Sequence, residues 1–131
     1  MERRRGGDRT AQGKLVLGPR RASGRRGALM LRWLNRKVEN AVLKQQIAMC
    51  TRILELGKEL RPEIEAAMQR RPDDERLRRY LWQLDAAEFL AINWRLLGHA
   101  GTMAPPDEMA GLRRSVDELT AIYKLVQKAK R

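Results

Sequence analysis

The sequence is poor in the residues from which most catalytic and metal sites are built. It contains one cysteine, Cys50, and one histidine, His99. A single cysteine excludes an intramolecular disulfide and fits a reducing compartment, so we expect a cytoplasmic protein. Cys50 and His99 would also supply only two of the four ligands of a structural zinc site. Because the sequence shows no nucleophile–base pair and no phosphate-binding loop either, we expect no enzyme, no cofactor and no small-molecule substrate.

Long apolar runs are also missing. The most apolar stretch, residues 84–98, is LDAAEFLAINWRLLG, and charged or amide side chains interrupt it at Asp85, Glu88, Asn93 and Arg95. A membrane-spanning helix needs about 20 predominantly apolar residues in a row, so the sequence predicts no membrane span. Hydrophobic residues make up 43% of the 131 residues and charged residues 34%. This balance and length are typical of one helix-rich globular domain.

Acidic side chains are scarce at the N-terminus. Residues 1–28 carry nine basic and two acidic side chains, and so hold more than half of the net charge of +12. They have too little apolar surface to offset the entropy lost on folding. We therefore expect a disordered Arg- and Gly-rich arm over residues 1–28 and a single helical domain over residues 29–131. The arm has two rival explanations: an over-extended translation start, with Met30 as the true first residue, or a polyanion-binding tail.

The region after the arm shows helical periodicity. Apolar positions from Leu31 to Leu60, with Gln45 as the one polar member, recur with spacings of 3, 4 and 4 residues, which keeps one stripe aligned on a nearly straight helix. A second stripe lies on another side of this helix and consists of Leu43, Ile47, Cys50 and Leu54. A helix with two apolar sides packs on two sides. Pro62 predicts the end of this helix and the start of a short second one, because the residue before a proline avoids the helical region.

Two further helices are predicted. Acidic residues after Pro72 favour the start of a third helix that runs to about Gly98, and Pro106 favours the start of a last one. The apolar residues of the last helix alternate spacings of 3 and 4, as in a heptad seam. The third helix is apolar nearly all round from Ala86, so we expect its large residues to be among the most buried: Leu84, Phe89, Ile92 and Leu96. The predicted fold is all-α, a small bundle of three long helices and one short helix.

Two tryptophans lie off the main stripes of their helices. Tryptophan is enriched at the residues that contribute most of the binding energy in protein interfaces. The second apolar stripe of the first helix must also be buried against another helix. The candidate partner interface is therefore Trp33, Leu43, Ile47, Leu54 and Trp82. We expect it to bind a protein partner or a second copy of the chain. The alternative is that these side chains pack within one molecule.

Basic side chains gather at both ends of the chain. The candidate contacts to a polyanion are Arg3, Arg4, Arg5, Arg25, Arg26, Lys124, Lys128, Lys130 and Arg131. Such side chains bind a phosphate backbone by charge and release counterions, with no folded site required. The C-terminal group also has a structural explanation, because cations complement the negative end of a helix dipole.

Three charged residues interrupt the apolar third helix: Asp85, Glu88 and Arg95. Asp85 and Glu88 lie three residues apart on one helix face, a spacing that would suit acid–base chemistry or a metal ion. A ferritin-type site needs Glu-x-x-His pairs, and His99 is not spaced to supply them. We expect instead a buried polar network in which Glu88 accepts a hydrogen bond from an arginine of another helix, because an unpaired buried acid is costly.

These patterns favour a non-enzymatic helical protein–protein interaction module, such as an adaptor, assembly or regulatory subunit. The alternative is a nucleic-acid-associated protein that binds the phosphate backbone non-specifically through the Arg-rich arm and the C-terminal basic group. Salt distinguishes the two hypotheses. Backbone binding weakens steeply with ionic strength, whereas an apolar helical interface responds little.

Overall fold

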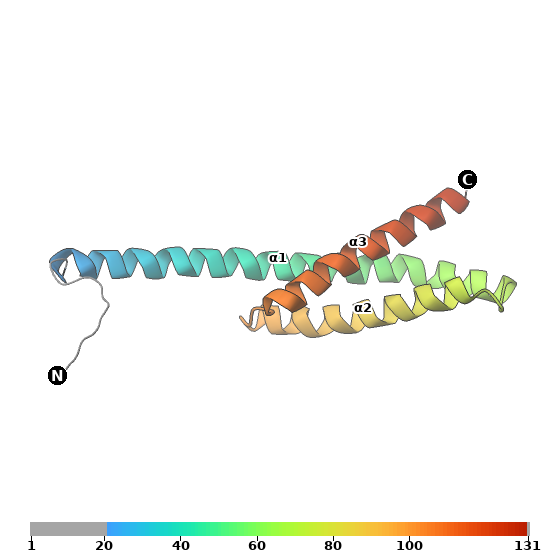
Figure 1. Cartoon of the computed structure of the whole chain (residues 1–131), viewed down its shortest axis with the longest axis horizontal. Coiled ribbons are helices and arrows are strands. Elements are labelled where there is room, and N and C mark those ends of the chain that lie inside the picture. The colour runs from blue at the N-terminus through green and yellow to red at the C-terminus, as the bar shows by residue number, and fades with distance from the viewer. Residues whose placement is uncertain (1–20, 131) are drawn as a thin grey trace, which may run out of the picture. The chain divides into compact units, whose positions relative to one another are not determined.

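The structure is a computed structural model that describes the backbone of residues 21–130 and the side chains of residues 26–130. In this range the protein is all-α, with three helices and no strands (Figure 1). The helices are α1 (Arg21–Arg70), α2 (Glu75–His99) and α3 (Pro106–Ala129). None of these helices combines the length and the apolar character needed to cross a membrane. The chain divides into two units, Met1–Val38 and Glu39–Arg131, and α1 contributes to both.

The start of α1 corrects part of the predicted arm. The helix begins at Arg21, so residues 21–28 are helical and not disordered. Arginine and alanine have high helix propensities, and an established helix adds each further residue at low cost. The predicted disorder of residues 1–20 lies outside the described residues.

The course of α1 through Pro62 corrects the predicted helix count. The expected short helix after this proline is part of α1, so the described part of the chain has three helices and not four. A proline inside a helix costs about 3 kcal/mol. On either side of it, however, Leu60 and Ile64 are 1% and 2% exposed, and burying such side chains contributes about 1.5–3 kcal/mol each. Tertiary packing therefore outweighs the local preference to end the helix.

Three helical segments pack together in the unit Glu39–Arg131. Polar contacts show that α2 runs antiparallel to α1, because Gln46 of α1 reaches Trp94 whereas Arg61 reaches Asp85 (Figure 1). Trp94 Nε1 donates a hydrogen bond to Glu108 near the start of α3. At the other end, Lys130 Nζ lies 2.8 Å from Glu63 of α1. α3 therefore runs beside both other helices, antiparallel to α2.

The core of this unit draws residues from all three helices. Its buried members are Cys50, Ile53, Leu56, Leu60, Ile64, Leu84, Ala87, Ala91, Leu112, Leu119 and Ile122. On α1 the buried side combines the two predicted stripes, because Cys50 comes from the second stripe and Ile53 from the first. Leu31, Leu34 and Val38, at the N-terminal end of the first stripe, are exposed.

Of the four α2 residues expected to be among the most buried, three are exposed, so the prediction is wrong for them. Leu84 is fully buried, but Phe89, Ile92 and Leu96 are 71%, 55% and 71% exposed. The reason is that α2 turns its small residues inward, among them Ala87 and Ala91. Small side chains let helix axes approach closely, and the large side chains of the same helix are then left on the opposite side.

Candidate functional site

The side of α2 that points away from the core carries a regular apolar stripe. Its residues, the outer face of α2, follow spacings of 3, 4, 3 and 4: Trp82, Asp85, Phe89, Ile92 and Leu96. The four apolar members are between 55% and 71% exposed. This spacing is the a/d pattern by which one helix packs on another in a coiled coil. In the described residues, no other helix covers this stripe.

The size of the exposed surface sets it apart from scattered surface leucines. Taking about 200 Å² for a large side chain, the exposed fractions amount to roughly 500 Å² of apolar area. That value lies in the upper part of the range for the largest patch on a monomeric protein, about 300–600 Å², and such patches are often functional. The outer face of α2 is therefore the strongest candidate interaction surface in the unit Glu39–Arg131.

A second group of exposed apolar residues lies in the unit Met1–Val38. Its members are Leu29, Met30, Leu31, Trp33, Leu34 and Val38, all between 46% and 63% exposed. The Lys37 ammonium lies 4.7 Å from the ring centre of Trp33, within cation–π range. This contact shields one side of the indole and leaves 54% of the residue exposed.

The structure places the candidate interface residues in different settings. Trp33 is exposed, and Trp82 belongs to the outer face of α2. Leu43, Ile47 and Leu54 are half-buried on α1. Leu54 packs against the core, and Ile47 lies close to the backbone of α2. Ile47 therefore lies at the α1–α2 contact, whereas Trp82 points away from it.

Sequence reasoning missed Phe89, Ile92 and Leu96 as surface residues. The available signal was the heptad spacing that they share with Trp82. It was hidden because the inward side of α2 is also apolar, with Leu84 as well as the small Ala87 and Ala91 in the core.

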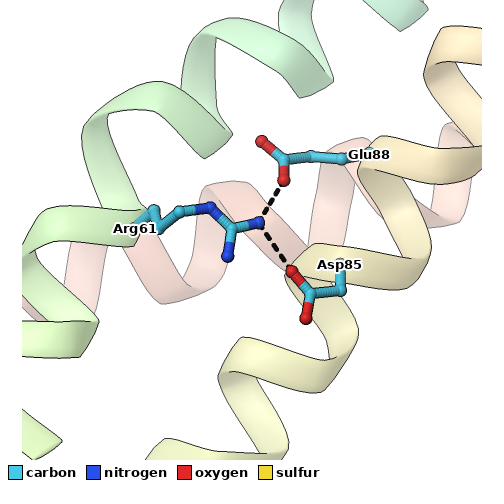
Figure 2. A network of polar contacts seen from close by, with 3 residues as sticks. All are labelled: Arg61, Asp85 and Glu88. Atoms are coloured by element: carbon cyan, nitrogen blue, oxygen red, sulfur yellow. Dashed lines mark hydrogen bonds and ion pairs between the residues drawn. The ribbon is translucent and has the colours of Figure 1, made fainter.

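Asp85 and Glu88 share one arginine, as Figure 2 shows. Arg61 Nη2 of α1 donates hydrogen bonds to Asp85 Oδ1 at 2.6 Å and to Glu88 Oε1. These bonds raise the pKa of Arg61 above its ordinary value, and the bond to Asp85 has the larger effect. The Glu88 carboxylate lies over Gly57 of α1, where an added Cβ atom would collide with it. A glycine in α1 thus makes room for the ion pair between the two helices.

The network differs from the predicted one in two respects. Neither acid is fully buried, since the side chains of Asp85 and Glu88 keep 59% and 21% of their accessible area. Arg95 takes no part in the network, because in the described part of the chain it forms no ion pair with either acid; the cation is Arg61, an arginine of another helix. Both carboxylates are held by one guanidinium, an arrangement that fastens α1 to α2. Across the described residues, no group of three or more histidine, cysteine or acidic side chains is placed to hold a metal ion.

Gln46 is a buried polar residue that sequence analysis did not single out. It is fully buried, and its Nε2 donates to the carbonyl oxygens of Trp94 at 2.8 Å and Thr102 at 3.1 Å. Its Oε1 accepts a hydrogen bond from the backbone N–H of Ala104 at 2.7 Å. One side chain thereby fixes the loop between α2 and α3. The loop turns at Gly101, whose φ of 88° suits glycine.

A cleft of about 350 Å³ lies among the three helices near the C-terminal end of α3. The residues that line it include Ile64, Tyr80 and Ile122. On its rim, Lys130 donates to Glu63, which raises the pKa of the lysine. The described residues that line it include no serine, threonine, cysteine or histidine.

The candidate polyanion contacts are only partly described. Arg3, Arg4, Arg5 and Arg131 lie outside the described residues, and so does the side chain of Arg25. Arg26 is exposed, as are Lys124 and Lys128 on α3 and Lys130 just beyond it. The lysines stand at the C-terminal end of α3, where positive charge complements the helix dipole.

Comparison with known proteins adds no assignment. No family model, no curated protein and no solved structure matches this chain.

Proposed function

We propose that this protein is a non-enzymatic helical interaction module that binds another helical chain through the outer face of α2. One observation carries the proposal: four large apolar side chains lie exposed at heptad spacing on one helix. Covering them removes apolar surface from water at about 25 cal/mol per Å². A partner helix with its own apolar stripe supplies the matching shape.

The remaining contacts of α2 hold this face in place. Arg61 ties α2 to α1, and Trp94 ties it to Glu108 of α3. The face therefore belongs to a rigid element and not to a loop, and binding loses little conformational entropy. An adaptor, an assembly factor or a regulatory subunit uses such a surface.

The test is capture of proteins from an extract of the native host by the immobilised full-length chain. We compare the wild-type chain with Phe89→Glu, and use Leu125→Glu as the matched control, because Leu125 is a 56% exposed leucine on α3. We expect a helical protein to bind the wild type and the control but not Phe89→Glu. Equal capture by all three chains would refute a role for the outer face of α2.

The alternative function is non-specific binding to nucleic acid, favoured by the exposed Lys124 and Lys128 and by the net charge of +12. Replacing both lysines by glutamine should then weaken binding to duplex DNA and flatten its dependence on salt. Capture that survives high salt and depends on Phe89 supports the interaction module instead.

A further inference from the structure

We propose that the helical chain bound by the outer face of α2 is a second copy of this protein, paired through α2 in antiparallel orientation. This inference rests on the proposed function and adds the identity of the partner. The order of apolar and charged residues along α2 favours this pairing.

The apolar residues favour a two-fold axis near the middle of the outer face. If the axis passes between Leu90 and Ala91, residues equally far from it on either side lie opposite each other in the two copies. Phe89 of each copy then packs against Ile92 of the other. These two central layers are the most apolar part of the stripe, because Asp85 lies further out.

The charged residues decide the orientation. In an antiparallel pair, residues on the same side of the stripe meet across the interface. Glu88 and Arg95 lie on the side next to α1, one on each side of the axis. With a rise of 1.5 Å per residue, Glu88 of one copy lies within about 3 Å, along the helix axis, of Arg95 of the other. Glu88 stays bound to Arg61, so the antiparallel pair brings opposite charges near each other on this side of the stripe without a direct ion pair.

A parallel pair lacks this complementarity. In that orientation same-numbered residues meet, so Asp85 faces Asp85 across the interface, and like charges directly opposite are unfavourable. The opposite side of the stripe carries Ala86 and Asn93, which are small and uncharged. They add no repulsion and allow close approach in the antiparallel pair.

The area predicts a weak dimer. Two patches of roughly 500 Å² bury about 1,000 Å² in total, at the lower limit for specific interfaces. We expect a dissociation constant of about 10–100 µM. The exposed stripe of residues 29–38 is a rival occupant, but it carries Arg32, Arg36 and Lys37. These cations would approach Arg95, so like charges would meet where the antiparallel pair brings opposite charges together.

The first experiment is sedimentation equilibrium of the purified full-length chain up to roughly ten times that dissociation constant. The wild type should dimerise, and Phe89→Glu should weaken the dimer at least about tenfold, the effect of a buried charge in a small interface. Leu125→Glu should leave it unchanged, and circular dichroism checks that each variant is folded. A monomeric wild type, or an unaffected Phe89→Glu variant, would overturn the proposal. Loss of the dimer in Leu34→Glu alone would assign the interface to residues 29–38.

The second experiment tests the orientation by disulfide formation between two differently tagged variants, Ala86→Cys and Asn93→Cys. In the antiparallel pair these positions lie within about 3 Å of each other along the helix axis, whereas two copies of position 86 are about 14 Å apart. The native Cys50 is fully buried and does not compete. We expect the mixed disulfide to form several times faster than either symmetric one. Equal rates would overturn the antiparallel arrangement.

The outcomes also separate this inference from the proposed function. One outcome is a monomeric wild type that captures a helical protein from the host extract through Phe89. In that case the self-association proposal fails, and the proposal of an interaction module is supported. If the wild type is monomeric and captures nothing through Phe89, both proposals fail.

Discussion

Replacing Gln46 by leucine should destabilise the protein more than any other change of a glutamine in α1. The side chain is fully buried and takes part in three hydrogen bonds, to Trp94, Thr102 and Ala104. Leucine has a side chain of similar bulk but forms none of these three hydrogen bonds. The backbone N–H of Ala104, a residue that is only 7% exposed, is left without its acceptor.

The size of the effect follows from these contacts. A buried polar group that loses its partner costs about 1–3 kcal/mol, and an ordinary hydrogen bond contributes about 0.5–1.5 kcal/mol. The carbonyl of Thr102 belongs to an exposed residue and regains water, so its loss counts little. We therefore expect Gln46→Leu to lower the free energy of unfolding by about 2–4 kcal/mol.

Urea unfolding followed by circular dichroism measures this difference. The control is Gln45→Leu, a change of the neighbouring exposed glutamine, which should stay within about 0.5 kcal/mol of the wild type. Hydrogen exchange adds a local readout, because the amide of Ala104 should lose protection in Gln46→Leu. If Gln46→Leu costs less than about 1 kcal/mol, or no more than Gln45→Leu, the assigned role of Gln46 is wrong.

Three further predictions concern other contacts of the fold. Burial raises the pKa of the Cys50 thiol to about 11, so a thiol reagent at pH 8 should modify it only as fast as the protein unfolds; rapid labelling of the native protein would contradict this. Gly57→Ala should displace the Glu88 carboxylate from Arg61, so that a subsequent Arg61→Met substitution costs less stability than in the wild type. Asp74 accepts a hydrogen bond from the N–H of Arg76 at the start of α2, which lowers the pKa of Asp74. A depressed folded-state pKa stabilises above the unfolded-state pKa, so Asp74→Ala should lower the melting temperature at pH 7 and make no difference once the pH falls below the folded-state pKa; a difference independent of pH would refute the cap.

The sequence predicted those helix ends that depend on local chemistry. α3 begins at Pro106, as expected, because a proline at the first position loses no helical hydrogen bond. The start of α2 follows from the side chain of Asp74, which caps the helix. These signals lie within a few residues of the feature that they determine.

Features that depend on tertiary packing could not be predicted. Pro62 has the same local signal as Pro106, but Leu60 and Ile64 are buried around it and the helix continues. Phe89, Ile92 and Leu96 of the outer face were taken for core because hydrophobicity alone does not tell which side turns inward in a helix segment that is apolar nearly all round. Ala87 and Ala91 decided it, since their small size lets the helices approach.

An interaction surface on α2 requires that Phe89 is a surface residue available to a partner and not part of the core. Urea unfolding at about 1 µM, well below the expected dissociation constant, compares Phe89→Ala with Leu84→Ala in the same helix. Leu84 is fully buried whereas Phe89 is 71% exposed. We predict that Leu84→Ala lowers the free energy of unfolding by about 2–5 kcal/mol and that Phe89→Ala lowers it by less than about 1 kcal/mol. A loss for Phe89→Ala as large as that for Leu84→Ala would show that this side of α2 is core, and would contradict its assignment as an interaction surface.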